Sequence, residues 1–423
     1  MTAKSPIKHQ LQSVKKFYFL EYFYVLLKSV QVSTREDRIF EQFLILKHKH
    51  RLGESRYKKL SDESTASPQQ MIRYRYTFEQ VANEAEDYGL ISTTNGNFLL
   101  TEDGHKVIQI YEEKEPIDSY RYLLDLMERK HYAFHYLINV CYANNPNKSG
   151  LLIFPIYSAY QLGIKRDSIK TSKDLKNYFN VLKIRLQEDI NRYLGKTIEL
   201  ASKNEELIES LIQSNMLSKT DSDVFDPNSY NVILKRGRDF WLKYFLQDLY
   251  NYSFSLSSFD IWAYRGKQIG VLHITEFYPD PNFNGRLVYP LSVIRSTSNS
   301  SNFFNLYTYP DQSHLYVHQP SWGNEQNQEE FVQSLHHAYL DVRQTARSYF
   351  VNLSSVRERV CYTMRISEYL FDKFLSYAYH QRLKIKISLE VDKLPDETQV
   401  MYVQREPVMV DGKYRNIIAI DLA

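Results

Sequence analysis

The strongest pattern of hydrophobic positions lies between residues 76 and 108, where it changes from a helical spacing to a strand-like one. The first part places hydrophobic side chains at i, i+3, i+4, i+7 and i+10, on one helix face: Phe78, Val81, Ala82, Ala85 and Tyr88. Thr77 can cap the start of this helix, and Gly89 stands where a helix ends through a left-handed residue. The segment predicts an amphipathic helix over about residues 77–88.

A tight β-hairpin is predicted directly after this helix. Asn95-Gly96 is a residue pair preferred in a type I′ turn, because both positions require positive φ. Strands at 90–91 and 98–100 flank the turn, and Thr101 can cap a last helix. The order helix, hairpin, helix resembles the winged helix-turn-helix family over about residues 35–113. The resemblance implies DNA binding through the helix before the hairpin, although the family also serves widely as a protein-binding module.

Basic residues precede this predicted recognition helix and continue into its start. The residues expected to contact phosphates of double-stranded DNA are Lys58, Lys59, Arg73 and Arg75. The hairpin turn, with Asn95 and Asn97, would lie along the DNA backbone or the minor groove. The helix also carries acids that oppose contact with phosphates: Glu79, Glu84, Glu86 and Asp87. Packing of the wing on another domain is therefore an equal alternative.

Residues 117–250 follow a mostly helical pattern of hydrophobic positions. One stretch interleaves basic and aromatic side chains: Lys235, Arg236, Arg238, Phe240 and Trp241. Such a stretch suits phosphate contacts combined with base stacking, and Lys235, Arg236 and Arg238 would extend the DNA footprint. The alternative is a solvated basic turn that leads into a core helix.

The pattern alternates after Phe254, which predicts β structure. Strands at 259–264 and 269–277 are expected to pair as a hairpin across Arg265-Gly266-Lys267. Further strands are predicted at 303–309 and 314–318, and a helix at 329–348. From residue 353 the order is again helix, turn, helix and two strands, at 384–391 and 415–422. This segment, 353–423, resembles a second winged helix through weaker signals.

One carboxylate pattern suggests metal-dependent chemistry. Asp260 and the following segment resemble the start of the PD-(D/E)xK nuclease motif, whose acids hold Mg²⁺. The motif lysine is missing, and Glu276 could act as the second acid only in a different strand register. A degenerate nuclease-like domain or an unrelated sheet fits these residues better than an active nuclease. His337 and Asp341, four residues apart, do not make a metal site by themselves.

Composition indicates a folded, soluble protein: 423 residues, 43% hydrophobic, 24% charged and a net charge of +3. This mild charge neither requires nor excludes nucleic acid. Two distant cysteines, Cys141 and Cys361, favour a reducing cytoplasm over a disulfide or zinc framework. No hydrophobic run reaches transmembrane length, so we expect a cytoplasmic location and no membrane partner.

We therefore expect an α+β multidomain protein with winged-helix modules at both ends, flanking a helical region and a β-rich region. The predicted domains span 1–116, 117–250, 251–350 and 351–423. The preferred function is non-catalytic DNA binding or DNA-complex assembly, within a microbial regulatory or anti-phage defence system, without a cofactor. The alternatives are a Mg²⁺-dependent endonuclease subunit, with Asp260 and Glu276 as catalytic acids, and a scaffold that binds only protein partners.

Overall fold

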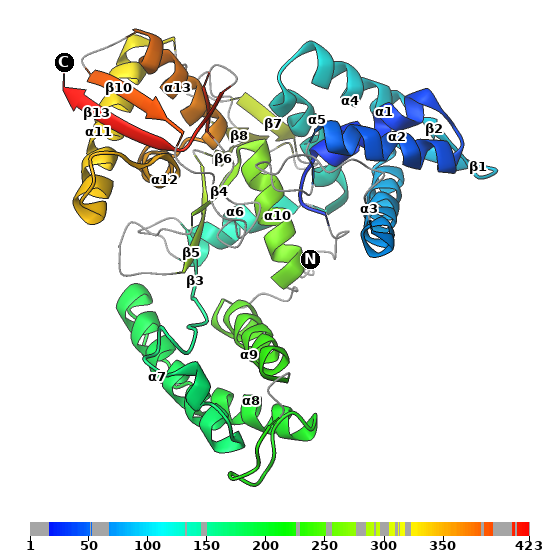
Figure 1. The fold of residues 1–423 in the computed structure, drawn as a ribbon. Coiled ribbons are helices and arrows are strands. Elements are labelled where there is room, and N and C mark those ends of the chain that lie inside the picture. Colours follow the sequence, from blue (N-terminus) through cyan, green and yellow to red (C-terminus); the bar gives the residue numbers. More distant parts are fainter. Residues whose placement is uncertain are drawn as a thin grey trace, which may run out of the picture. The chain divides into compact units, whose positions relative to one another are not determined.

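The computed structural model describes residues 17–50, 52, 67–131, 133–144, 150–225, 229–250, 256–275, 285–291, 293–296, 304–308, 312, 314–317, 323–381, 385–391, 408–410 and 413–422. The chain mixes helices with small sheets, which confirms the α+β prediction (Figure 1). It forms two compact units. Unit 1 comprises residues 1–142, 257–275 and 289–423, and unit 2 comprises residues 143–256 and 276–288.

Unit 1 begins with a series of helices that ends in the predicted hairpin and helix. The series is α1 (Glu21–Val32), α2 (Glu36–Lys49), α3 (Pro68–Asp87), β1 (Ile91–Thr94), β2 (Asn97–Leu100) and α4 (Glu102–Glu113). Ser67 and Gln70 form a capping box at the start of α3, which explains why this helix begins earlier than its hydrophobic face. The turn between β1 and β2 has φ of 50° at Asn95 and 75° at Gly96, as a type I′ turn requires.

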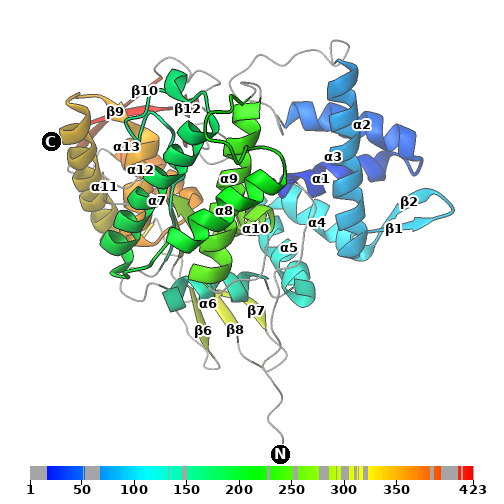
Figure 2. The same cartoon turned by 90° about the horizontal axis from the view of Figure 1, so that it is seen from below.

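The segment between α1 and α2 joins this hairpin as a short third strand. Arg35 forms a β-bridge with Asn97, and the Phe98 amide donates a hydrogen bond of 2.9 Å to the Thr34 carbonyl. β2 therefore pairs on both sides, with β1 and with residues 34–35. This pairing ties the start of β2, directly after the turn, to the segment between α1 and α2. The hairpin projects from the helices (Figure 2).

The C-terminal part of unit 1 repeats this order of elements. It comprises α11 (Glu325–Ala346), β9 (Val351–Asn352), α12 (Leu353–Met364), α13 (Glu368–Gln381), β10 (Ile385–Glu390), β11 (Val408–Val410), β12 (Lys413–Arg415) and β13 (Ile417–Leu422). The sheet has the order β10-β13-β9, so the strand before α12 again pairs with the last strand. Hydrophobic side chains of α11, α12, α13 and the sheet share one core. Both strands predicted here are confirmed.

Between these two series lie α5 (Pro116–His131), most of α6 (Ala133–Asn144), α10 (Leu256–Ile269) and β4 (Leu272–Thr275). A further sheet, in the order β6-β8-β7, comprises β6 (Val293–Ser296), β7 (Phe304–Thr308) and β8 (His314–Val317). The strand predicted at 259–264 and its hairpin turn are wrong, because these residues belong to helix α10. α10 is buried on nearly every side, so its hydrophobic residues show no helical stripe. Gly270, with φ of 85°, ends the helix before β4.

Unit 2 is mainly helical, as predicted. Its helices are α7 (Ser172–Leu194), α8 (Ala201–Gln213) and α9 (Tyr230–Tyr244), with a 3-10 turn at Arg166–Ser168 and a π-helical turn at Phe245–Leu249. β3 (Leu151–Ile153) pairs antiparallel with the start of β5 (Arg286–Pro290). Gly237 allows α9 to approach α7 closely, because a Cβ there would lie 2.6 Å from the Phe179 ring. Among the described helices of both units, none has the length and apolar character that a membrane span requires.

Candidate nucleic-acid interface

Helix α3 leaves one long face mostly exposed, which we call its free face. Phe78, Val81, Ala82 and Ala85 bury its opposite face. The free face presents side chains at helical spacing, all of them exposed except the half-buried Gln80: Gln69, Ile72, Arg73, Tyr76, Gln80 and Asn83. The β1–β2 hairpin projects beside the C-terminal end of this helix (Figure 2). The free face and the hairpin together form what we call the α3 surface.

The acids of α3, expected to oppose nucleic acid, all have partners within unit 1. Glu84 is buried and accepts hydrogen bonds of 2.6 and 2.9 Å from Arg265. Glu79 lies 3.5 Å from the Arg75 guanidinium, and Glu86 accepts a hydrogen bond of 3.2 Å from the Thr93 amide. Asp87 lies 3.3 Å from the Lys130 ammonium. Three of the four acids thus have a cationic partner, whereas Glu86 bonds only to a backbone amide, and Glu79, Glu86 and Asp87 remain exposed.

The bond between Glu84 and Arg265 fixes the position of α3. Both side chains are almost completely buried, and the guanidinium binds the carboxylate with two nitrogens. The same guanidinium donates to the Phe17 carbonyl at 3.3 Å and lies over the rings of Phe17 and Trp262. Burial and the neighbouring Glu84 carboxylate raise the pKa of Tyr88 well above its ordinary value. The C-terminal half of α3 is thus held by α10 through a desolvated ion pair.

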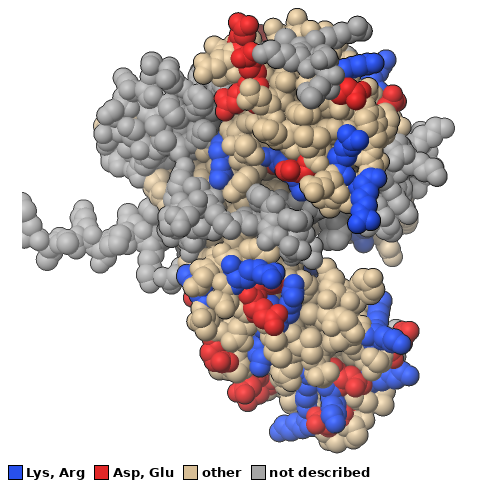
Figure 3. All heavy atoms as spheres, turned by 90° about the vertical axis from the view of Figure 1, so that its left-hand side faces the viewer, with Lys and Arg blue, Asp and Glu red and all other residues tan. Residues whose placement is uncertain are grey.

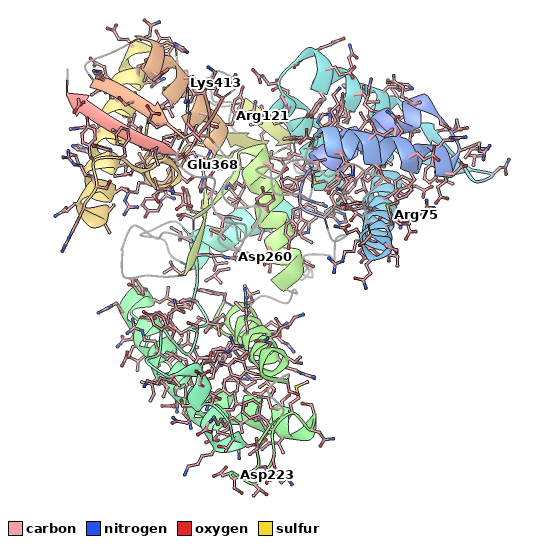
Figure 4. All side chains as sticks on the ribbon, viewed as in Figure 1. Arg75, Arg121, Asp223, Asp260, Glu368 and Lys413 are labelled. Atoms are coloured by element: carbon pink, nitrogen blue, oxygen red, sulfur yellow. The ribbon has the colours of Figure 1, made fainter. Side chains whose placement is uncertain are left out.

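The predicted basic contacts divide into two groups in the structure. Arg75 bonds to Glu36 of α2 and lies over the rings of Phe40 and Phe78, so it packs α2 against α3 (Figure 4). Arg73 is exposed and forms no ion pair with any residue that the structure describes. Lys58 and Lys59 lie outside the described residues. Arg73 is therefore the predicted cation that the α3 surface offers to a ligand.

The hairpin contributes polar groups without charge. Its sequence from Ile91 to Leu100 contains no acid and no base. Asn95 and Asn97 are both exposed, and Asn97 keeps its backbone in the bridge with Arg35. Leu99 is 44% exposed. Amide side chains and backbone N–H groups of this kind can contact phosphate or sugar oxygens without electrostatic steering.

The basic stretch of unit 2 lies on helix α9. Lys235, Arg236 and Arg238 are exposed, and none forms an ion pair within the described part of the chain. The expected base stacking by Trp241 is wrong, because its side chain is completely buried. Trp241 instead packs against Phe245, with ring centroids 6.2 Å apart. On the face of the molecule that Figure 3 shows, lysine and arginine side chains lie interspersed with aspartate and glutamate side chains.

The structure describes only one of the two acids of the alternative nuclease site. Asp260 is half-buried on helix α10 and does not lie on a strand (Figure 4). Glu276 lies outside the described residues. His337 and Asp341 are exposed on α11. Within the described ranges, no three histidine, cysteine, aspartate or glutamate side chains are placed to hold a metal ion.

A buried ionic cluster in unit 1 escaped the sequence analysis. The Glu368 carboxylate lies 3.0 Å from the Lys267 ammonium, 3.4 Å from the Arg357 guanidinium and 3.6 Å from the His273 ring. Burial opposes ionisation of Glu368, but the charges of Arg357 and Lys267 outweigh it and hold its pKa well below the ordinary value. Burial lowers the pKa of His273. The only sign of this cluster in the sequence was two basic residues, Arg265 and Lys267, inside a hydrophobic run.

Comparisons of the chain with protein-family models, curated proteins and solved structures found no match.

Proposed function

We propose that this chain is a DNA-binding protein that contacts double-stranded DNA through the α3 surface. The observation that carries the proposal is the composition of the free face of α3. Arginine, glutamine and asparagine are the side chains that read base edges in the major groove, and the face carries Arg73, Gln69 and Asn83. The exposed hairpin beside the helix would contact the sugar-phosphate backbone through Asn95 and Asn97.

The topology supports an assignment of both series in unit 1 as winged-helix modules. In each series, a short strand follows the first helix and pairs with the last strand of the module. In each, the third helix leads directly into the first long strand, β1 or β10. A winged helix uses its third helix for recognition, which corresponds to α3 in the first module and α13 in the second.

Further positive charge would come from α9 and from the segment before α3. Lys235, Arg236 and Arg238 would add phosphate contacts from unit 2, and each would release counterions from DNA. Lys58 and Lys59, which precede α3 in the sequence, would add phosphate contacts on the first module. These contacts would strengthen binding without reading the sequence.

A protein partner is the second candidate for the α3 surface, because the surface also exposes hydrophobic side chains. Ile72 is 70% exposed, Tyr76 is 47% exposed and Leu99 is 44% exposed. Exposed side chains of this kind suit an interface with protein as well as contacts with thymine methyl groups. Partner proteins and DNA-complex assembly therefore remain part of the proposal.

Binding to a duplex over several salt concentrations, with and without Mg²⁺, tests the proposed function. We expect affinity to fall as salt rises, and we expect Arg73→Ala to weaken binding at every salt concentration. Lys413→Ala is the matched control, because it removes one exposed positive charge from β12, away from the α3 surface (Figure 4). Equal binding by both variants would contradict the role of α3. Absence of duplex binding at low salt would favour a protein partner, and Mg²⁺-dependent cutting would favour the nuclease.

A further inference from the structure

A cavity of about 340 Å³ lies within unit 1 and takes no part in the proposed DNA contacts. Residues from both winged-helix-like series and from α5 and α10 line it. Aromatic rings form much of its wall: Phe19, Tyr111, Tyr120, Tyr264 and Tyr369. Its volume lies in the range of small-molecule sites, roughly 300–1,000 Å³. The cavity is thus large enough for a small organic ligand.

The charged groups of the cavity are mostly negative. Four carboxylates line it, against one lysine and one arginine: Glu21, Glu115, Glu368, Asp372, Lys267 and Arg357. Both cations are already directed at carboxylates of the same wall. Lys267 lies 3.0 Å from Glu368, and Arg357 lies 3.4 Å from Glu368 and 3.5 Å from Asp372. The positive groups therefore offer little to an anionic ligand.

The other three carboxylates of the cavity have partners of different kinds. Glu21 binds the His50 ring and the Tyr111 hydroxyl, each at 2.6 Å, and it has no lysine or arginine partner among the described residues. Glu115 bonds to Lys373 at 2.8 Å, outside the cavity lining, and is itself about half exposed. Asp372 lies 3.5 Å from the Arg357 guanidinium and adds its charge to the cavity wall. An ionised carboxylate can accept about four hydrogen bonds, so Glu21 retains acceptor capacity.

We propose that this cavity binds a small organic cation, such as an alkyl guanidinium or a quaternary ammonium compound. Aromatic rings attract cations through the negative face of their π system, and the carboxylates supply the counter-charge. The buried cluster of Lys267, Arg357 and Glu368 fixes the polar end of the wall, because none of these side chains can turn to water without separating from its partner. This inference does not depend on DNA binding.

Titration calorimetry of the full chain without DNA tests the inference. The probes are agmatine, a guanidinium compound, and choline, a quaternary ammonium compound, and AMP serves as the anionic comparison. We expect saturable binding of at least one cationic probe and none of AMP. We also expect Asp372→Asn to weaken that binding about tenfold, because it removes one cavity charge and keeps the side-chain shape. Glu330→Gln, on the exposed face of α11, is the matched control and should bind as the wild type does.

Tyr264→Leu provides a second test that leaves every charge in place. Loss of one ring should weaken cation binding severalfold, because the cation–π contribution of that ring is lost. A thermal melt of each variant shows that it is folded under the conditions of the titration. The inference is wrong if neither cation binds the folded wild type at millimolar concentration, if AMP binds as well as the cations, or if both cavity variants bind like the control.

Discussion

Helices α3 and α13 hold the same place in two series with the same order of elements, yet their surroundings differ. α3 exposes Arg73, Tyr76 and Asn83 along one face. On α13, every side chain from Glu368 to Tyr379 is buried or half-buried. The charges of α13 are also engaged inside unit 1, since Glu368 bonds to Lys267 and Lys373 bonds to Glu115. Despite the shared order of elements, α3 thus has an exposed face, whereas α13 is largely covered between Glu368 and Tyr379.

This difference indicates that side-chain partners, and not the order of elements, decide which of the two helices stays exposed. In the first series, the ion pair of Glu84 and Arg265 anchors one end of α3 and leaves its outer face free. In the second, the ionic cluster around Glu368 attaches α13 to α10 and α12. Both anchors use helix α10, through Arg265 and Lys267. α10 is thus the structural support common to the two series.

The largest expected effect comes from breaking the anchor of α3. Glu84→Gln should lower the free energy of unfolding by about 3–5 kcal/mol, because it leaves the Arg265 charge buried without its counter-ion. Glu79→Gln is the matched control and should cost less than about 1 kcal/mol, since that ion pair is exposed. Urea denaturation measures both values. Equal losses in the two variants would show that the buried pair does not anchor α3.

A pH-dependent loss of stability should identify the anchor of α13. The folded pKa of Glu368 lies below its ordinary value, so its ionised form stabilises the native state at pH above the unfolded pKa. That stability should be lost progressively as pH falls below about 4.5. We expect the free energy of unfolding, measured between pH 6 and pH 3, to fall less steeply in Glu368→Gln than in the wild type. Parallel pH profiles would contradict the ionised state of Glu368.

DNA affinity should separate the two helices directly. Asn83→Ala, on the exposed face of α3, should lose about 1–3 kcal/mol of binding free energy on a specific site, or roughly 5- to 150-fold in affinity. Lys373→Ala, on α13, should leave affinity within about twofold, because its ammonium bonds to Glu115 inside unit 1. Fluorescence anisotropy with one labelled duplex measures both. A larger loss in Lys373→Ala would reverse the assignment of the two helices.

The smallest expected effect concerns α9. Replacing Arg236 and Arg238 by alanine should weaken DNA binding equally for all sequences and reduce the slope of log affinity against log salt by about 2. Replacing the exposed Lys413 in the same way provides the control. An unchanged slope in the α9 variant would confine the DNA footprint to unit 1.

Local signals in the sequence predicted parts of this structure. Features that depend on partners far away in the sequence were not predicted. The Asn95-Gly96 turn and the face of α3 follow from neighbouring residues, so both were predictable. Helix α10 was mistaken for a strand because burial on nearly all sides removed its periodicity and its aromatic residues favour strands. The roles of Arg75, bonded to Glu36, and of Arg265, bonded to Glu84, depend on residues 39 and 181 positions away. A single sequence does not reveal such pairs.

Amide hydrogen exchange with and without a bound duplex tests the central claim most directly, because it compares α3 and α13 in one sample. We predict that DNA slows exchange in α3 and in the β1–β2 hairpin, from Pro68 to Leu100, and leaves exchange in α13, from Glu368 to Gln381, unchanged. Protection of α13 without protection of α3 would contradict the claim.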